Sequence, residues 1–324
     1  MAALALVPIR QESAALLAHS VNRAEAYARN SKAENTRRGY TSDWRQFDAW
    51  CTSAGLASLP AAPETVALYI GALAETHKPA TIGRHLAAIA SAHKARGHNS
   101  PASMQHGAVS AVWKGIKRTH GTAQAQKAPL LTAGLRTVVG TLSDRLIGTR
   151  DRALLLVGFA GAFRRSELVG LNREDIEFST DGLVVTLRRS KTDQDGQGRK
   201  VGLPYGSNPD TCPVRSLRAW LDASGIEAGP MFRHVNRHGH MQPGRLSGAA
   251  VALVVKRHAG AAGLDASKFS GHSLRAGLAT SAAIAGASDR SIMNQTGHRS
   301  LNMVRRYIRD ASLFRENAAA VVGL

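Results

Sequence analysis

Cysteine, aromatic residues and acidic side chains are scarce in this chain of 324 residues, and each scarcity narrows the possible functions. The two cysteines, Cys51 and Cys212, have no close spacing to each other, which is typical of reduced thiols in the cytosol and not of a disulfide framework. Aromatic residues make up 5% of the chain, so base stacking is not the expected mode of binding to nucleic acid.

Long hydrophobic runs are also missing. The apolar runs at residues 1–9 and 249–255 are far shorter than the roughly 20 residues that cross a bilayer. The N-terminus has no basic region followed by an apolar stretch, so no secretory signal peptide is expected. We therefore expect a cytoplasmic protein without a membrane partner.

Motifs for common cofactors are absent as well. The chain has no phosphate-binding glycine-rich loop followed by Lys and Ser or Thr, and no paired-carboxylate metal motif. His234, His238 and His240 suggest a metal site at first sight, but no acidic or cysteine ligand is nearby and histidines in a basic loop are usually solvated. We expect neither a nucleotide nor a metal cofactor.

The chain does carry a large excess of positive charge. It has 42 Lys and Arg residues against 23 Asp and Glu, which gives a formal net charge of +19. A globular fold needs no such excess, so a polyanionic partner is indicated. Nucleic acid, bound through its phosphates, is the first candidate, and an anionic membrane is the second.

The first third of the chain predicts a small helical bundle with a basic surface. Asn35 is a candidate N-cap for a helix that starts at Thr36, and Pro63 suits the first turn of a second helix. Apolar residues recur at helical spacing in both, and in two further segments after Pro79 and around Trp113. The polar faces of these helices carry Arg37, Arg38, Arg45, Arg84, Lys94, Lys114 and Lys117.

The remaining sequence predicts a second domain. Residues 121–129 lack periodicity and indicate a flexible linker between residues 1–120 and a domain at 130–324. Helices are expected over 132–163 and again from Val214, interrupted by a basic loop at 233–245. A strand pair is expected at 183–187 and 200–203. The expected fold class is therefore mainly α with a small β-sheet (α+β).

Cutting DNA without a metal ion requires a particular set of side chains. Fixed cations must surround the phosphodiester, and arginine suits this task because its planar fork pairs with two phosphate oxygens. A nucleophile must attack the phosphorus, and a general acid must protonate the departing 5′ oxygen. One therefore expects scattered Arg, Lys and His residues together with one hydroxyl group.

The chain contains such a set. It consists of Arg164 with Glu167, Lys191, His272, Arg275, His298 and Tyr307, in that order along the sequence. Each member alone has an ordinary structural explanation: Tyr307 as a partly buried aromatic residue, Arg164 as a helix cap, Lys191 as a hairpin charge. Their joint occurrence favours catalysis.

The order and spacing of these residues resemble the tyrosine recombinase (phage integrase) family, and the stretches GHSLRAG and NMVRRYIRD are similar to its Cre-like members. The resemblance runs over nearly the whole chain. It implies a helical N-terminal DNA-binding domain and a catalytic domain that form a clamp around duplex DNA. It also implies that Arg164 and Arg275 clamp the scissile phosphate, that His298 contacts a phosphate oxygen and that Glu167 supports the site.

The resemblance further assigns the proton transfers and the nucleophile. His272 is expected to hydrogen-bond the phosphate and to assist proton transfer to or from the tyrosine. Lys191 is expected to protonate the 5′ hydroxyl leaving group. Tyr307 is expected to attack the phosphorus and form a 3′-phosphotyrosine, which conserves the phosphodiester energy without a nucleotide cofactor.

DNA reading is the part in which this sequence departs from the family pattern. Cre-like members can carry Trp where His298 stands, and Ala249 stands where a base-reading arginine is expected. The resemblance places Arg37, Arg38 and Arg84 among the DNA-binding residues. Arg84 falls where a side chain contacts bases in the major groove, although a contact to phosphate alone is the competing interpretation.

The expected partner is a double-stranded DNA target site with inverted-repeat half-sites. Exchange between two duplexes needs four cuts, so a homotetramer of two synapsed dimers is expected on DNA. The short apolar segment 318–324 resembles the terminal helix that the family exchanges between protomers. A helix folded back onto its own core is the alternative.

The sequence leaves two other functions open. A type IB topoisomerase shares the chemistry but relaxes supercoils, and recombination of two marked sites distinguishes the two activities. A catalytically silent DNA-binding regulator would form no covalent adduct with DNA. The intact catalytic set favours the recombinase.

Overall fold

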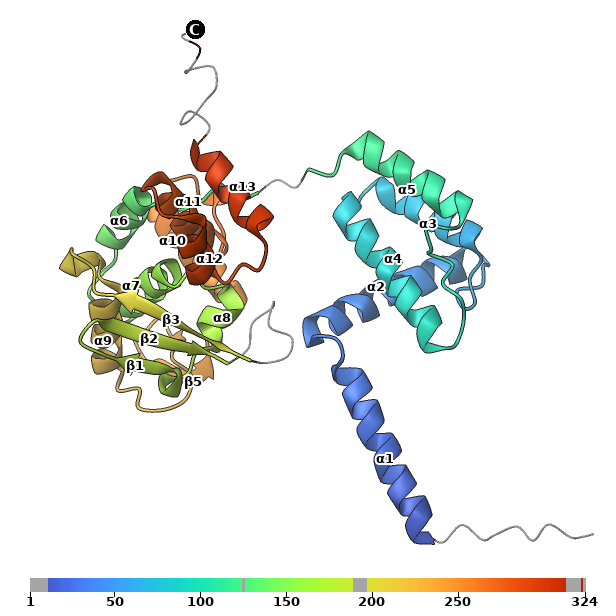
Figure 1. The fold of residues 1–324 in the computed structure, drawn as a ribbon, viewed down its shortest axis with the longest axis horizontal. Coiled ribbons are helices and arrows are strands. Elements are labelled where there is room, and N and C mark those ends of the chain that lie inside the picture. The colour runs from blue at the N-terminus through green and yellow to red at the C-terminus, as the bar shows by residue number, and fades with distance from the viewer. Residues whose placement is uncertain (1–10, 124–125, 189–196, 313–321, 323–324) are drawn as a thin grey trace, which may run out of the picture. The chain divides into compact units, whose positions relative to one another are not determined.

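The structure is a computed structural model that describes residues 11–123, 126–188, 197–312 and 322. The chain divides into two compact units, Met1–Gln124 and Ala125–Leu324, called here unit 1 and unit 2. Both are mostly helical, and unit 2 contains two small antiparallel sheets (Figure 1). The expected fold class, mainly α with a small sheet, is confirmed. Within the described residues, no helix has the length and apolar character needed to span a membrane.

Unit 1 consists of helices at the expected positions and one more. The helices are α1 (Gln11–Asn30), α2 (Glu34–Ser53), α3 (Pro63–Ala74), α4 (Pro79–Ala95) and α5 (Gly107–His120). Pro63 and Pro79 occupy the first turns of α3 and α4, where a missing backbone N–H costs no hydrogen bond. Asn35 is not the N-cap, because α2 begins at Glu34 and the Ala33 carbonyl accepts from the amides of residues 36 and 37.

The core of unit 1 lies where α2 packs on α4 and α3 packs on α5. Phe47, Tyr69, Ile82 and Ile89 are almost completely buried there. This burial leaves the opposite faces of α2 and α4 available for polar side chains, which is the arrangement that the helical spacing predicts.

Unit 2 surrounds the long apolar helix α7 (Leu146–Ala160), which packs on α9 (Pro213–Ser224). Its other helices are α6 (Thr132–Gly140), α8 (Arg165–Gly170), α10 (Gly248–Ala261), α11 (Ser273–Ile284), α12 (Asp289–Thr296) and α13 (Leu301–Ser312). Short 3₁₀ turns lie at Arg173–Asp175, Pro209–Thr211 and Ala266–Lys268. A separate small apolar core joins α11, α12 and α13 through Ala279, Ile292 and Val304.

The main sheet has the antiparallel order β1 (Ile176–Phe178), β2 (Gly182–Leu187), β3 (Arg199–Pro204). The predicted strand pair is β2 and β3, with Leu187 opposite Arg199. Lys191 belongs to the connection at residues 189–196, which lies outside the described residues.

The prediction of a basic loop at 233–245 is wrong. These residues form a hairpin of β4 (Arg233–Val235) and β5 (Met241–Arg245). Val235 is buried opposite the partly buried Met241, and the Asn236 amide donates to the His240 carbonyl at the turn. The strands are too short and too basic to give an alternating pattern in the sequence.

Candidate active site

Arg275 lies in the first turn of α11 and is one of the most deeply buried charged residues of unit 2, with 1% of its surface exposed. Its Nη1 donates to the carbonyl of Ala162 over 2.7 Å. Ala162 has φ of 47°, a left-handed conformation that costs energy for a residue with a Cβ and that recurs at functional sites. Burial and the nearby Arg164 lower the pKa of Arg275 to about 10, so its guanidinium remains charged at neutral pH.

Arg164 precedes α8 and is held by a carboxylate of the same helix. Glu167 accepts from the Arg164 backbone amide at 2.9 Å and from Nη1 of the same residue at 2.6 Å. The carboxyl side chain is 2% exposed, so water screens this pair weakly. Glu167 therefore holds one edge of the Arg164 guanidinium and offsets part of its positive charge.

Tyr307 on α13 is 8% exposed, and its hydroxyl lies 3.0 Å from Nε2 of His272. Burial lowers the pKa of His272, and Arg275, Arg164 and Arg165 lower it further. A neutral imidazole at this distance can accept the phenolic proton, since hydrogen-bond reach is the geometric requirement for a general base.

His298 follows Gly297, the residue in left-handed conformation that ends α12. The hydroxyl of Thr296 lies 2.7 Å from the Ile292 carbonyl and 2.8 Å from Nδ1 of His298. The single hydroxyl proton goes to the carbonyl, so Nδ1 carries the imidazole hydrogen and donates to Thr296. Nε2 of His298 then accepts from Nη2 of Arg275 at 2.9 Å.

The protonation of His298 agrees with this assignment. Burial, followed by the charge of Arg275, lowers the pKa of His298 to about 4. Its ring also stacks on Tyr307, with centroids 5.9 Å apart and planes inclined by 27°. The starts of α8 and α11, the segment just after the end of α12 and the middle of α13 thus bring together Arg164, Glu167, His272, Arg275, His298 and Tyr307, whereas Lys191 lies outside the described residues.

Sequence reasoning missed one further cation at this site. Arg199 on β3 contributes to the electrostatic environment of both Arg275 and His298. It shares the inward face of β3 with buried Val201 and Leu203, and a lone arginine among apolar residues at every second position was the available signal.

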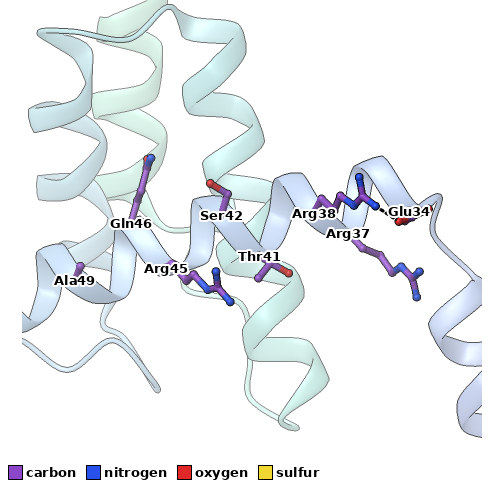
Figure 2. Close-up of a pocket in the computed structure, with 8 residues that line it drawn as sticks. All are labelled: Glu34, Arg37, Arg38, Thr41, Ser42, Arg45, Gln46 and Ala49. Atoms are coloured by element: carbon purple, nitrogen blue, oxygen red, sulfur yellow. Dashed lines mark hydrogen bonds and ion pairs between the residues drawn. The ribbon is translucent and has the colours of Figure 1, made fainter. Parts of the chain in front are cut away.

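The basic residues of α2 in unit 1 lie on the surface of the helix, unlike the buried Arg275 of unit 2. Figure 2 shows Arg37, Thr41 and Arg45 projecting from one side of α2, at the four-residue spacing that places side chains on one helical face. Arg38 forms an ion pair with Glu34. A groove along the helix is lined by Glu34, Arg37, Arg38, Thr41, Ser42, Arg45, Gln46 and Ala49.

Arg84 on α4 is paired to a buried carboxylate. Asp43 of α2 is 2% exposed and accepts from Nε and Nη2 of Arg84 at 2.6 and 2.9 Å. Behind it, Nε2 of the buried His85 lies 3.4 Å from Asp43, and Nδ1 of that ring lies 3.0 Å from the hydroxyl of Tyr69. The Arg84 side chain itself is 53% exposed, so its outer donors reach solvent.

In the part of the chain that the structure describes, no group of three His, Cys, Asp or Glu side chains has the arrangement of a metal site. This holds for the hairpin residues His234, His238 and His240, and one of them, His238, accepts from Nε of Arg237.

Comparison with known proteins adds a sequence relationship over most of the chain. The phage integrase family matches residues 131–313. An integrase/recombinase xerD homolog of Selenomonas ruminantium is 42% identical over 300 residues, which cover 91% of this chain and 87% of that protein. The recombinase cre of Escherichia phage P1 is 28% identical over 306 residues, which cover 87% and 86% of the two chains.

Solved structures with the same fold include two integrases. A lambda integrase (75–356) dimer bound to a COC' core site matches with a TM-score of 0.57 and 19% identity, covering 92% of this chain and 97% of that one. The Tn1549 transposon integrase in complex with transposon right end DNA matches with a TM-score of 0.60 and 15% identity, covering 92% and 98%. At these identities the likeness establishes the fold.

Proposed function

We propose that this chain, which belongs to the phage integrase family and is a tyrosine site-specific recombinase, breaks duplex DNA with Tyr307 and rejoins it through a 3′-phosphotyrosine. The observation that carries the proposal is the contact of 3.0 Å between the Tyr307 hydroxyl and Nε2 of His272, beside buried Arg275. A nucleophile, its base and a fixed cation within one small site are what phosphodiester cleavage requires.

In the first step the Tyr307 oxygen attacks the phosphorus while His272 takes the phenolic proton. A new phosphorus–oxygen bond to the tyrosine forms as the bond to the 5′ oxygen breaks. Arg164 and Arg275 hold the non-bridging oxygens, because their charge is fixed in place before the substrate arrives. Lys191 gives a proton to the departing 5′ oxygen.

The second step is the reverse reaction with a different 5′ hydroxyl. The hydroxyl of a second duplex attacks the phosphotyrosine, Lys191 takes its proton, and Tyr307 leaves with a proton from His272. One phosphodiester bond is lost and one is gained, so the exchange requires no energy source.

His298 holds Arg275 in the protein without DNA. Its Nε2 is an acceptor there, and an acceptor cannot donate to a phosphate oxygen. We therefore assign it a contact with the scissile phosphate that forms when the imidazole hydrogen moves from Nδ1 to Nε2. The Thr296 hydroxyl then donates to Nδ1, so this exchange of tautomers needs no additional proton.

The proposed partner is a double-stranded target site with inverted-repeat half-sites, enclosed by a basic clamp of an N-terminal DNA-binding domain (1–120) and a catalytic domain (130–324) joined by residues 121–129. Arg37 and Arg38 would contact the phosphates and Arg84 a base. Four protomers would synapse two sites at the nucleoid. The exchanged terminal helix proposed for 318–324 falls outside the described residues, apart from residue 322.

The decisive experiment uses Tyr307→Phe with a nicked suicide substrate. The variant is expected to bind target DNA with normal affinity and to form no covalent adduct on a denaturing gel, because only the nucleophile is lost. Tyr205→Phe, a change at a more exposed tyrosine of unit 2, is the matched control and should form the adduct normally. An adduct of normal intensity with Tyr307→Phe would refute the assignment.

A further inference from the structure

Arg199 is a cation on the core-facing side of a strand. Along β3, Val201 and Leu203 are buried while Lys200 and Gly202 are exposed, so Arg199 points toward the interior. Its Nη2 is inaccessible to solvent and has no hydrogen-bond partner among the described residues. Burial lowers the pKa of Arg199, and the charge of Glu167 opposes this shift. A strand that needed only packing would be served by an apolar residue here.

The guanidinium of Arg199 binds the C-terminal end of α12. Its Nη1 donates to the carbonyls of Asn294 and Gln295 at 3.1 and 3.2 Å. The last four carbonyls of a helix have no partner within the helix, and they carry the negative end of its dipole. The Gln295 side chain strengthens the same connection by donating to the carbonyl of Gly202 at 3.2 Å.

Arg199 also contacts the residue that turns the chain into the active site. Gly297 has φ of +65°, and a Cβ added there would lie 2.8 Å from Cζ and Nε of Arg199. The guanidinium therefore packs directly on the Gly297 backbone, and His298 is the next residue. Glycine is required at 297 for two reasons, the left-handed conformation and this close approach.

We propose that Arg199 is a positioning residue for His298, acting through the end of α12. The inference rests on the proposed function, in which His298 holds Arg275 and then contacts the scissile phosphate. Arg199 fixes two carbonyls and the glycine that precede His298, so its loss frees the imidazole to move away from Nη2 of Arg275. Register places Arg199 opposite Leu187, so the same residue connects α12 to the two strands that lead into and out of the segment containing Lys191.

A double-mutant cycle tests this proposal. Single-turnover cleavage is measured at saturating DNA for the wild type, Arg199→Ala, His298→Ala and the double variant. Arg199→Ala alone is expected to slow cleavage by roughly 10- to 100-fold, since misplacing a group by about 1 Å can cost on the order of 10²-fold. In the His298→Ala background it should slow cleavage by less than about twofold, because residues acting through one another are not additive.

Lys200→Ala is the matched control, because it removes a cation from the neighbouring position of β3 on the exposed side. It should leave cleavage unchanged in both backgrounds. Equal slowing by Arg199→Ala with and without His298 would overturn the proposal and would indicate a direct phosphate contact or a general loss of structure. Unchanged cleavage by Arg199→Ala would overturn it as well.

Normal cleavage by His298→Ala alone would remove both the proposed role of His298 and the inference about Arg199. Equal slowing by Arg199→Ala in both backgrounds, or no slowing at all, would overturn the inference and leave the proposed function intact. If Arg199→Ala fails to fold, as thermal unfolding would show, Arg199→Lys carries the test. Lysine keeps the charge and has one donor nitrogen in place of three, so it should slow cleavage less than the alanine variant is expected to, and again only when His298 is present.

Discussion

The protein uses arginine in two contrasting ways, in the site of unit 2 and along α2 of unit 1. Arg275 is 1% exposed and donates to a carbonyl and to an imidazole, whereas the Arg38 side chain is 73% exposed and pairs with Glu34 on its own helix. A buried cation costs desolvation energy, but it stands in place before the substrate arrives and water screens it weakly. An exposed cation costs little and is screened by salt.

From this contrast we expect the buried arginines of unit 2 to determine the rate of cleavage and the exposed arginines of α2 to determine the affinity for DNA. Fixed charges act on the transition state when the phosphate oxygens gain charge, so substitutions in the buried site should reduce the rate of cleavage at saturating DNA. Exposed charges release counterions as they meet phosphates, so substitutions on α2 should reduce affinity and its dependence on salt. If substitution of a buried arginine changed the affinity for DNA and left the cleavage rate unchanged, this separation would be wrong.

The largest effect after loss of the nucleophile is expected for Arg275→Lys. Lysine retains a charge but cannot donate to the Ala162 carbonyl, to His298 and to a phosphate oxygen in the same planar arrangement. Cleavage at saturating DNA should fall by about 10²- to 10³-fold, the usual loss when one preorganised donor is removed. Rapid-quench measurement of the covalent adduct would determine the rate.

Arg37→Ala is the partner experiment in unit 1. Its cleavage rate at saturating DNA should equal that of the wild type, while its affinity should weaken and the slope of log affinity against log salt should fall by about one. Identical behaviour of the two variants would contradict the separation of rate from affinity.

Much of the fold follows from local sequence signals. Pro63 and Pro79 mark helix starts, and apolar side chains at helical spacing identify the buried faces of α2 to α5. The start of α2 could not be placed from Asn35, because Glu34 also suits a first turn and its backbone joins the helix. The β4–β5 hairpin was hidden because its strands have three and five residues, too few to give a periodic pattern of apolar side chains.

The proposed catalytic set came from the sequence for a different reason, namely its resemblance to the order of residues in the family. Its geometry did not. The carbonyl that holds Arg275 belongs to Ala162, 113 residues away, and no residue type is required for a backbone contact. Arg199 and Asp43 were missed because each acts through contacts between elements far apart in the sequence, 41 residues in the case of Asp43 and Arg84.

The pH dependence of cleavage tests whether the buried arginines and His272 act together in the site. The pKa of His272 is lowered by burial and by three arginines, and only its neutral form can take the proton of Tyr307. The cleavage rate at subsaturating DNA should therefore persist to a lower pH than an ordinary histidine base would allow. Below the lowered pKa it should decrease about tenfold per pH unit.

Arg165→Ala tests the electrostatic cause. Arg165 is exposed, and its charge helps to lower the pKa of His272. Its removal should raise that pKa and move the decrease in cleavage to higher pH. Rates under subsaturating conditions from pH 5 to 8 would detect the displacement, and an unchanged profile would mean that the charge of Arg165 does not set the pKa of His272.

The smallest predicted effect, confined to one or two base pairs per half-site, concerns Arg84. Asp43 accepts from Nε and from one hydrogen of Nη2, so three of the five N–H donors remain, and one on Nη1 and one on Nη2 form an outer fork for a partner in DNA. That fork matches O6 and N7 of guanine, and the pair is worth roughly 1–3 kcal/mol of discrimination. Arg84→Ala should lose preference at that position across a library of site variants, whereas Arg37→Ala should weaken all variants alike.

Asp43 decides between a base contact and a phosphate contact for Arg84. A base contact needs the fork held in one orientation, which the buried carboxylate supplies, while a phosphate contact tolerates a mobile side chain. Asp43→Asn keeps the shape and removes the charge that holds Nε and Nη2. It should relax preference at the same base pair as Arg84→Ala while leaving affinity for the remaining variants nearly unchanged, with thermal unfolding as the check on folding. Preserved preference in Asp43→Asn, or a uniform loss of affinity in Arg84→Ala, would make Arg84 a backbone contact, equivalent to the exposed arginines of α2.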